Sequence, residues 1–114
     1  MEKEIYELHA NICRILSNPK RLEILNRLRD KEMSAGELKD LTGLTKANLS
    51  QHLAVLRERK IVTARREGVN IHYRITNPKV IQACDLMREV LYDQLAEDGK
   101  LAKRLRTKRR PKRF

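Results

Sequence analysis

The part of the sequence that most constrains the fold is TGLTKANLSQHLAVLRERKIVTARREGVNIHYRIT, residues 42–76. It begins with a helix pattern, in which leucines recur every three or four residues and the first turns are polar. Two short β patterns follow, residues 61–66 and 69–76, around the turn Glu67-Gly68. A helix can enter a DNA major groove, and a neighbouring hairpin can reach the backbone beside it. This order of elements predicts a winged helix-turn-helix.

Four further helix boundaries have strong local signals. Asn-Pro pairs at Asn18 and Asn77 predict two helix starts, because Asn caps a helix and Pro fits its first turn. The first of these helices is expected to continue to about residue 29, and Gly99 is expected to cap the end of the second. Ser34 and Glu37 form a capping-box pattern, and Thr45 is expected to cap the helix of residues 46–59. A first helix over residues 3–17 completes a mainly α chain of five helices with a hairpin wing before the last. In the third helix, Leu38 and Leu41 are expected to face inward.

The net charge of +11 belongs mainly to one end of the chain. Nine of the 26 Lys and Arg residues lie in residues 100–114, which contain no acid, so residues 1–99 have a net charge of only +2. We therefore predict a folded domain over residues 1–99 and a basic, partly disordered tail over residues 100–114. Residues 46–74 have a local charge of +5, which is the kind of basic patch that phosphate contact requires.

The candidate DNA-binding residues follow from this patch. Asn48 and Gln51 have amide ends that can pair with adenine, and Lys46 can reach a guanine or a phosphate. His52 lies nearer the buried side, where packing or a phosphate contact competes with base contact. The alternative to DNA contact is that this is an ordinary amphipathic helix with a solvated face and that the arginines of the strands are simply solvated. The full predicted set is Lys46, Ala47, Asn48, Ser50, Gln51 and His52 in the helix and Arg65, Arg66 and Arg74 in the hairpin, with Arg66 preferred beside the Gly68 turn.

The first and last helices each have an apolar stripe close to coiled-coil spacing. One of these stripes would remain partly exposed in a monomer, so we expect the two helices to pair across a two-fold homodimer. The predicted dimerisation residues are Ile5, Leu8, Ile12, Val80, Cys84, Met87 and Leu91.

His9 and Cys13 are one helical turn apart, and Cys84 lies on the last helix, so these three form a candidate thiol or metal sensor. Packing is the stronger interpretation, because a reduced Cys in an apolar stripe behaves as a small hydrophobe. The charged N-terminus lacks a signal-peptide pattern and no apolar run reaches membrane-spanning length, which predicts a cytoplasmic protein with reduced cysteines and no membrane partner.

Several motifs resemble those of the ArsR/SmtB family of winged-helix regulators. They are residues 16–25 (LSNPKRLEIL), 36–38 (GEL), 49–57 (LSQHLAVLR), 61–68 (IVTARREG) and 73–75 (YRI), and the resemblance covers about residues 5–95. It implies a homodimeric, cytoplasmic transcriptional regulator, usually a repressor that an inducer releases from duplex DNA.

The residues that the family uses to sense metals or thiols are replaced. The resemblance places Ser34 and Gly36 at the Cys-x-Cys pair of one metal site, and Asn26 at the position of a sensing Cys. At the other metal site it places Asn77, Lys79, Val90 and Asp93, of which a protonated Lys and a Val cannot bind a metal. We expect no metal site there, and the small effector is not identifiable from the sequence.

Two other functions remain possible. The basic tail favours a non-specific nucleic-acid-binding protein, and the terminal helices favour a protein-interaction module. The sequence contains no phosphate loop, nucleophile elbow or paired histidine motif, so we expect neither an enzyme nor a bound cofactor.

Overall fold

The computed structural model describes residues 2–99 and 104. The chain divides into two compact units, residues 1–77 and 78–114, and each is described by itself below. A boundary after residue 99, as the charge distribution predicts, remains a prediction. The predicted basic tail lies outside the described residues, except for Arg104. None of the helices in the described part of the chain is long and apolar enough to cross a membrane.

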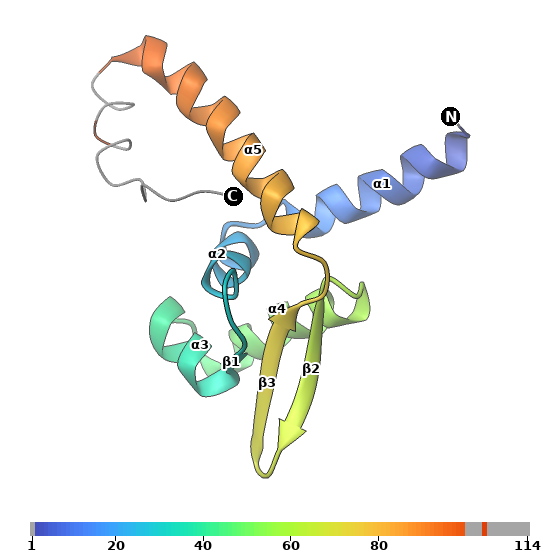
Figure 1. Cartoon of the computed structure of the whole chain (residues 1–114), viewed down its shortest axis with the longest axis vertical. Coiled ribbons are helices and arrows are strands. Elements are labelled where there is room, and N and C mark those ends of the chain that lie inside the picture. The colour runs from blue at the N-terminus through green and yellow to red at the C-terminus, as the bar shows by residue number, and fades with distance from the viewer. Residues whose placement is uncertain (1, 100–103, 105–114) are drawn as a thin grey trace. The chain divides into compact units, whose positions relative to one another are not determined.

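The first unit contains four helices, α1 (Lys3–Leu16), α2 (Pro19–Arg27), α3 (Ala35–Thr42) and α4 (Lys46–Glu58) (Figure 1). Three predicted caps are confirmed. The Asn18 side chain accepts hydrogen bonds from two backbone amides at the start of α2, and the Thr45 side chain accepts one at the start of α4. Ser34 and Glu37 form the complete capping box of α3. These bonds stabilise helix ends whose first amides have no partner within the helix.

Two strands form the predicted hairpin, β2 (Val62–Glu67) and β3 (Asn70–Ile75), and Figure 1 shows it as a narrow ribbon that extends beyond the helices of this unit. The prediction that Glu67-Gly68 forms the turn was wrong by one residue. Glu67 pairs with Asn70, so the loop is Gly68-Val69. Gly68 has a φ of 64° at the first loop position, a conformation that glycine adopts without steric cost.

A third strand, β1 (Met33–Ser34), was not predicted. It pairs antiparallel with β3 through Met33–Tyr73 and Ser34–His72, giving a sheet with the order β1-β3-β2. Two residues are too few for an alternating pattern to be visible in the sequence. The pairing joins the wing to the segment that leads into α3.

The core of the first unit consists of leucines and other apolar side chains from α2, α3, α4 and the sheet. Its most buried members are Ile24, Leu25, Leu28, Leu38, Leu49, Leu53, Leu56 and Val62. The prediction for Leu41 was wrong, since this side chain is 43% exposed whereas Leu38 is fully buried. The helix α1 has no buried residues and projects from the rest of its unit (Figure 1).

The described part of the second unit consists of α5 (Lys79–Leu95) and a short 3-10 helix, η1 (Ala96–Asp98), which ends at the predicted cap Gly99. The N-cap of α5 is Pro78, so the prediction that Asn77 caps this helix was wrong by one residue. Asp85 is buried and forms an ion pair with Arg88 at 3.0 Å.

Candidate nucleic-acid interface

The helix α4 separates a buried apolar side from an exposed polar side. Leu49, Leu53 and Leu56 are each at most 2% exposed and anchor the helix in the core. The Thr45 hydroxyl accepts a hydrogen bond from the Asn48 amide at 3.1 Å and so orders the first turn. Five of the six predicted helix residues are exposed, namely Lys46, Ala47, Asn48, Ser50 and Gln51. The first two turns of α4 therefore present amide, hydroxyl and ammonium groups on a rigid surface.

The sixth predicted residue, His52, is half-buried and contacts the body of the protein. Its Nδ1 atom lies 3.4 Å from the Arg21 guanidinium, whose Nε donates a 2.7 Å hydrogen bond to the Ile15 carbonyl. Burial lowers the pKa of the His52 imidazole, and the positive charge of Arg21 lowers this pKa further. His52 is therefore neutral at neutral pH, and its half-buried side chain agrees with its predicted position nearer the buried side.

The three wing arginines have different surroundings. Arg65 forms ion pairs with Glu32 at 2.6 Å and with Glu67 at 3.2 Å. Arg66 and Arg74 are exposed and form no ion pair with any other described residue. Side chains alternate along a strand, so Arg66 lies on the face of the sheet opposite to Arg65. Among the predicted wing residues, Arg66 and Arg74 therefore have unpaired charges that a phosphate can use.

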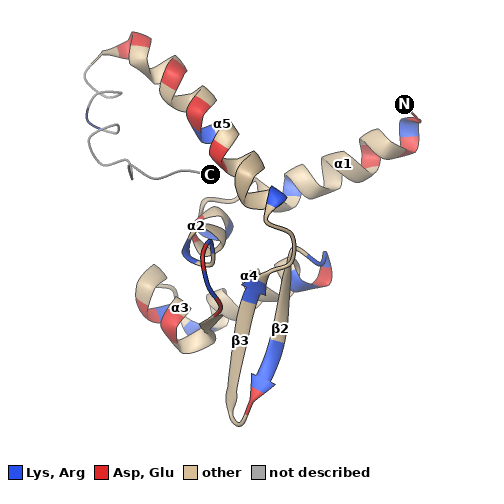
Figure 2. Ribbon diagram, viewed as in Figure 1, with Lys and Arg blue, Asp and Glu red and all other residues tan. Residues whose placement is uncertain are grey.

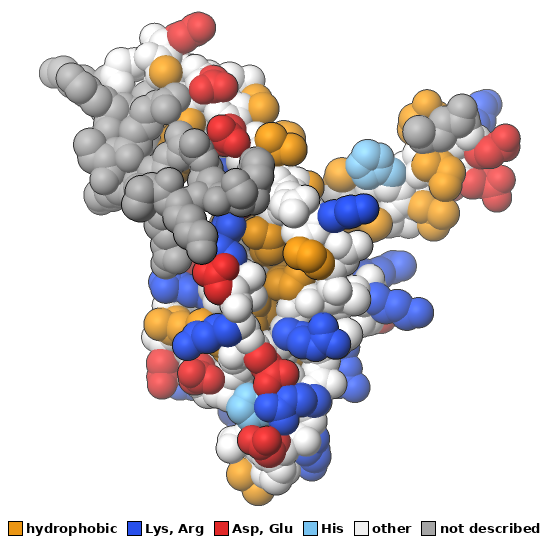
Figure 3. All heavy atoms as spheres, in the orientation of Figure 1, with side chains coloured by type: hydrophobic (Ala, Val, Ile, Leu, Met, Phe, Trp, Pro, Cys, Tyr) orange, Lys and Arg blue, Asp and Glu red, His pale blue; other side chains and the backbone are white. Residues whose placement is uncertain are grey.

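Lys and Arg residues gather around the hairpin and the end of α4. Figure 2 shows Lys and Arg on β2, on β3 and near the end of α4, whereas α5 has several Asp and Glu residues. The space-filling view shows that Lys and Arg side chains are numerous on the visible face of the wing, with acids between them (Figure 3). The positive charge that this surface can offer to a phosphate depends on which of its arginines are not already paired with an acid.

The predicted dimerisation residues of α1 are exposed in the single chain. Ile5, Leu8 and Ile12 are 46%, 59% and 48% exposed, and Figure 3 shows apolar side chains at the surface of α1. In α5, Met87 and Leu91 are exposed as well, whereas Val80 and Cys84 are half-buried. Each helix therefore has apolar surface that its own unit leaves open to water.

The candidate sensor residues do not form a metal site among the described residues. His9 and Cys13 are exposed on α1, and Cys84 is half-buried in α5. No three His, Cys, Asp or Glu side chains of the described residues are placed to hold a metal ion. The Ser34 hydroxyl, at a metal position of the family that the sequence resembles, is engaged in the capping box.

Two residues that contact the candidate interface were missed in the sequence. Arg21 lies in a helix start and contacts His52, which is 31 residues away. Glu32 lies in a short connection and contacts Arg65, which is 33 residues away. Arg21 lies within the motif of residues 16–25, but that motif does not indicate which residue it contacts, and Glu32 has no local pattern that distinguishes it from an ordinary surface charge.

A family model, related sequences and solved structures all relate the chain to bacterial DNA-binding regulators. Residues 18–64 match the model of the bacterial regulatory protein, arsR family. An HTH-type transcriptional regulator of Mycobacterium tuberculosis is 38% identical over 85% of this chain and 87% of its own, and its crystal structure superimposes with a TM-score of 0.76. A biofilm growth-associated repressor of Xylella fastidiosa is 39% identical over 82% of each chain. A homodimeric winged helix-turn-helix DNA-binding domain from Mycobacterium bovis has a TM-score of 0.70 at 28% identity, over 85% of this chain and 93% of its own.

The fold and the exposed polar turns of α4 define a winged helix-turn-helix DNA-binding protein. The wing is the β2–β3 hairpin, and α4 is the recognition helix. The chain belongs to the ArsR family of bacterial regulatory proteins, and it is a DNA-binding transcriptional regulator. The resemblance found in the sequence is confirmed.

Proposed function

We propose that the protein represses transcription by binding a pseudo-palindromic duplex site as a homodimer. The observation that carries the proposal is the exposed polar side of the recognition helix, held rigid by three buried leucines on its other side. Asn48 and Gln51 would pair with adenine edges, Lys46 would contact a guanine or a phosphate, and Ser50 would contact the backbone. Repression is supported by the Xylella fastidiosa relative, which is named a repressor.

The homodimer is supported by the exposed apolar surfaces of α1 and α5 and by the homodimeric state of the Mycobacterium bovis domain. A second copy of the chain would cover these surfaces and remove apolar area from water. Two-fold symmetry would then place two recognition helices in successive major grooves, about 34–36 Å apart. The binding site should accordingly contain two similar half-sites about one helical turn apart.

The test is selection of genomic fragments that bind the purified protein, followed by affinity measurements on a selected fragment and on random DNA. Gln51→Ala should weaken binding to the selected fragment by about 1–3 kcal/mol, the usual value of a bidentate base contact, and should leave binding to random DNA nearly unchanged. The matched control is Gln82→Ala, since Gln82 is an exposed glutamine on α5. A protein that prefers no fragment over random competitor would overturn the proposal.

A second candidate function rests on the nine basic residues of residues 100–114. If the tail supplies the affinity, the protein would bind any nucleic acid and affinity would follow charge. Deletion of residues 100–114 would then abolish binding, while Gln51→Ala would have no effect. If the recognition helix supplies specificity, the deletion should weaken binding to selected and random DNA alike and flatten the salt dependence, leaving the preference for the selected fragment intact.

A further inference from the structure

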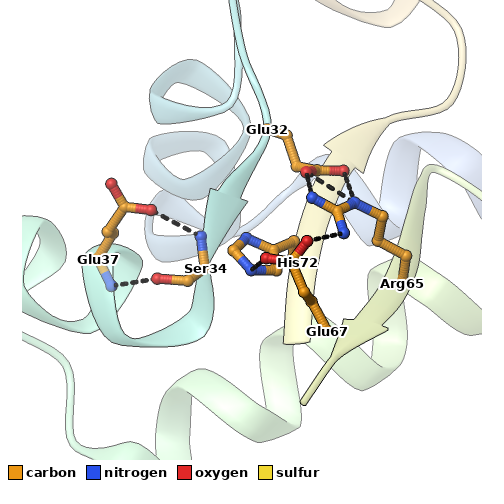
Figure 4. Close-up of polar contacts among 6 residues, drawn as sticks. All are labelled: Glu32, Ser34, Glu37, Arg65, Glu67 and His72. Atoms are coloured by element: carbon orange, nitrogen blue, oxygen red, sulfur yellow. Dashed lines mark hydrogen bonds and ion pairs between the residues drawn. The ribbon is translucent and has the colours of Figure 1, made fainter. Parts of the chain in front are cut away.

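The side chain of Arg65 is half exposed and binds two carboxylates of the protein. Its Nη2 atom lies 2.6 Å from Glu32 Oε1, its Nε atom lies 2.9 Å from both Glu32 oxygens, and its Nη1 atom lies 3.2 Å from Glu67 Oε2 (Figure 4). All three nitrogens of the guanidinium therefore donate to carboxylates. We call these three residues the Glu32–Arg65–Glu67 clamp.

The clamp offsets the positive charge of Arg65 in this part of the wing. Two carboxylates against one guanidinium give the clamp a net charge of −1. Hydrogen bonds from Arg65 hold the pKa of the Glu32 carboxyl below its usual range, and the bonds to Glu32 and then Glu67 raise the pKa of Arg65. Glu32 and Arg65 therefore stay ionised at neutral pH. A phosphate that approaches this guanidinium also approaches the two carboxylates beside it.

The clamp joins parts of the fold that are distant in the sequence. Glu32 precedes β1, and Arg65 lies 33 residues later in β2, opposite His72 of β3. The short strand β1 meets the hairpin only through Met33 and Ser34. The clamp therefore adds a second link between the hairpin and the segment that begins α3, and Figure 4 shows it beside the Ser34–Glu37 capping box.

We propose that Arg65 is a positioning residue for the wing, and that the Glu32–Arg65–Glu67 clamp holds the hairpin so that the neighbouring Arg66 contacts the DNA backbone. A planar guanidinium that binds two carboxylates restrains direction as well as distance. Arg66 follows Arg65 on the opposite face of β2, is exposed and forms no ion pair with another described residue. The proposal rests on the DNA-binding function proposed above.

Glu32→Gln gives opposite results for the two roles of Arg65. The substitution removes an acid near the DNA-binding surface, so it should tighten binding if Arg65 contacts phosphate, because Arg65 is released. If the clamp positions the wing, Glu32→Gln should weaken binding to the selected fragment about two- to fivefold, the range expected for an exposed ion pair. Glu32→Asp keeps the carboxylate and should retain most of the wild-type affinity.

The salt dependence of binding separates contact from positioning. Each lost phosphate contact reduces the slope of log affinity against log salt by about one. Arg66→Gln should therefore flatten this slope, whereas Arg65→Gln should weaken binding with the slope unchanged. Tighter binding by Glu32→Gln, or a slope that Arg65→Gln and Arg66→Gln flatten equally, would overturn the proposal. The proposed function is tested separately, by whether the wild-type protein prefers the selected fragment over random DNA. That measurement uses none of these variants.

A purely structural role for the clamp is tested by unfolding. If Glu32→Gln lowers the free energy of unfolding but binds the selected fragment like the wild type, the clamp supports only the fold and the proposal is wrong. Weaker binding at temperatures where the variant remains fully folded supports positioning of the wing.

Discussion

The Arg21 guanidinium connects the recognition helix to the end of α1, because it lies 3.4 Å from the His52 Nδ1 atom and also donates to the Ile15 carbonyl. Arginine can only donate, so His52 Nδ1 must accept and the ring hydrogen is assigned to Nε2. One side chain from α2 thus contacts both the projecting helix α1 and the helix α4. Any shift of α1 against α2 would disturb the surroundings of His52.

The pH dependence of stability should reveal the contribution of His52. Its folded pKa lies below the value of about 6.5 for the unfolded chain, so its stabilising contribution is present above that pH and is lost as the pH falls through the folded pKa. The free energy of unfolding should fall between about pH 7.5 and about pH 5.5 by more in the wild type than in His52→Gln. Urea unfolding at one protein concentration measures this difference, and equal falls in the two proteins would contradict the prediction.

The cap of the recognition helix should contribute to stability and to binding. Thr45→Ala removes the acceptor of the Asn48 amide and should lower the free energy of unfolding by about 0.5–2 kcal/mol. Binding to the selected fragment should weaken too, since the first turn contains Lys46 and Asn48. Thr45→Ser keeps the hydroxyl and should resemble the wild type in both measurements.

The two leucines of α3 should differ sharply. Leu38→Ala leaves a cavity in the core and should cost about 2–5 kcal/mol, because Leu38 is fully buried. Leu41 is 43% exposed, so Leu41→Ala should change stability by about 0.5 kcal/mol or less. Chemical unfolding of both variants measures the difference, and a large loss in Leu41→Ala would show that another surface covers this side chain.

Lys60 should be a site where glycine stabilises the protein. It follows the end of α4 with a φ of 62°, and the Lys60 and Ile61 amides donate to the Arg57 and Leu56 carbonyls. This left-handed conformation costs roughly 1–2 kcal/mol for a residue with a Cβ atom, so Lys60→Gly should raise the free energy of unfolding by about 1 kcal/mol or less. Lys60→Ala keeps the strain and should give no such gain. Thermal unfolding of the two variants would settle the point.

The apolar stripe of α1 should control assembly. Leu8 is 59% exposed, so Leu8→Glu should leave the fold of a single chain intact but place a charge in the proposed dimer contact. Sedimentation equilibrium should show a shift from dimer toward monomer. Glu7→Gln changes an exposed residue on the other side of the same helix and should leave the dimer unchanged. An equal effect of both substitutions would exclude the stripe as the contact.

The sequence alone determined the features that depend on neighbouring residues. Asn18, Ser34 and Thr45 cap helices through bonds to amides two or three residues away, so their type and spacing were sufficient to predict them. The leucine spacing of α4 likewise predicted its buried side, and the motif order predicted the family. The leucine spacing assigns one side of α4 to the core, so the opposite, polar side could be predicted from the sequence as well.

Only the tertiary structure decided the features that depend on distant partners. The strand β1 exists because Met33 and Ser34 meet Tyr73 and His72, and no local pattern indicates this pairing. Arg65 was one of three candidate DNA-binding arginines of the wing, and the structure pairs its side chain with Glu32, 33 residues earlier in the chain. The local sequence around a charged residue does not show whether its side chain is paired or free. The register of the sheet and the course of the neighbouring loop decide which acids lie beside it, and therefore how available its charge is to DNA.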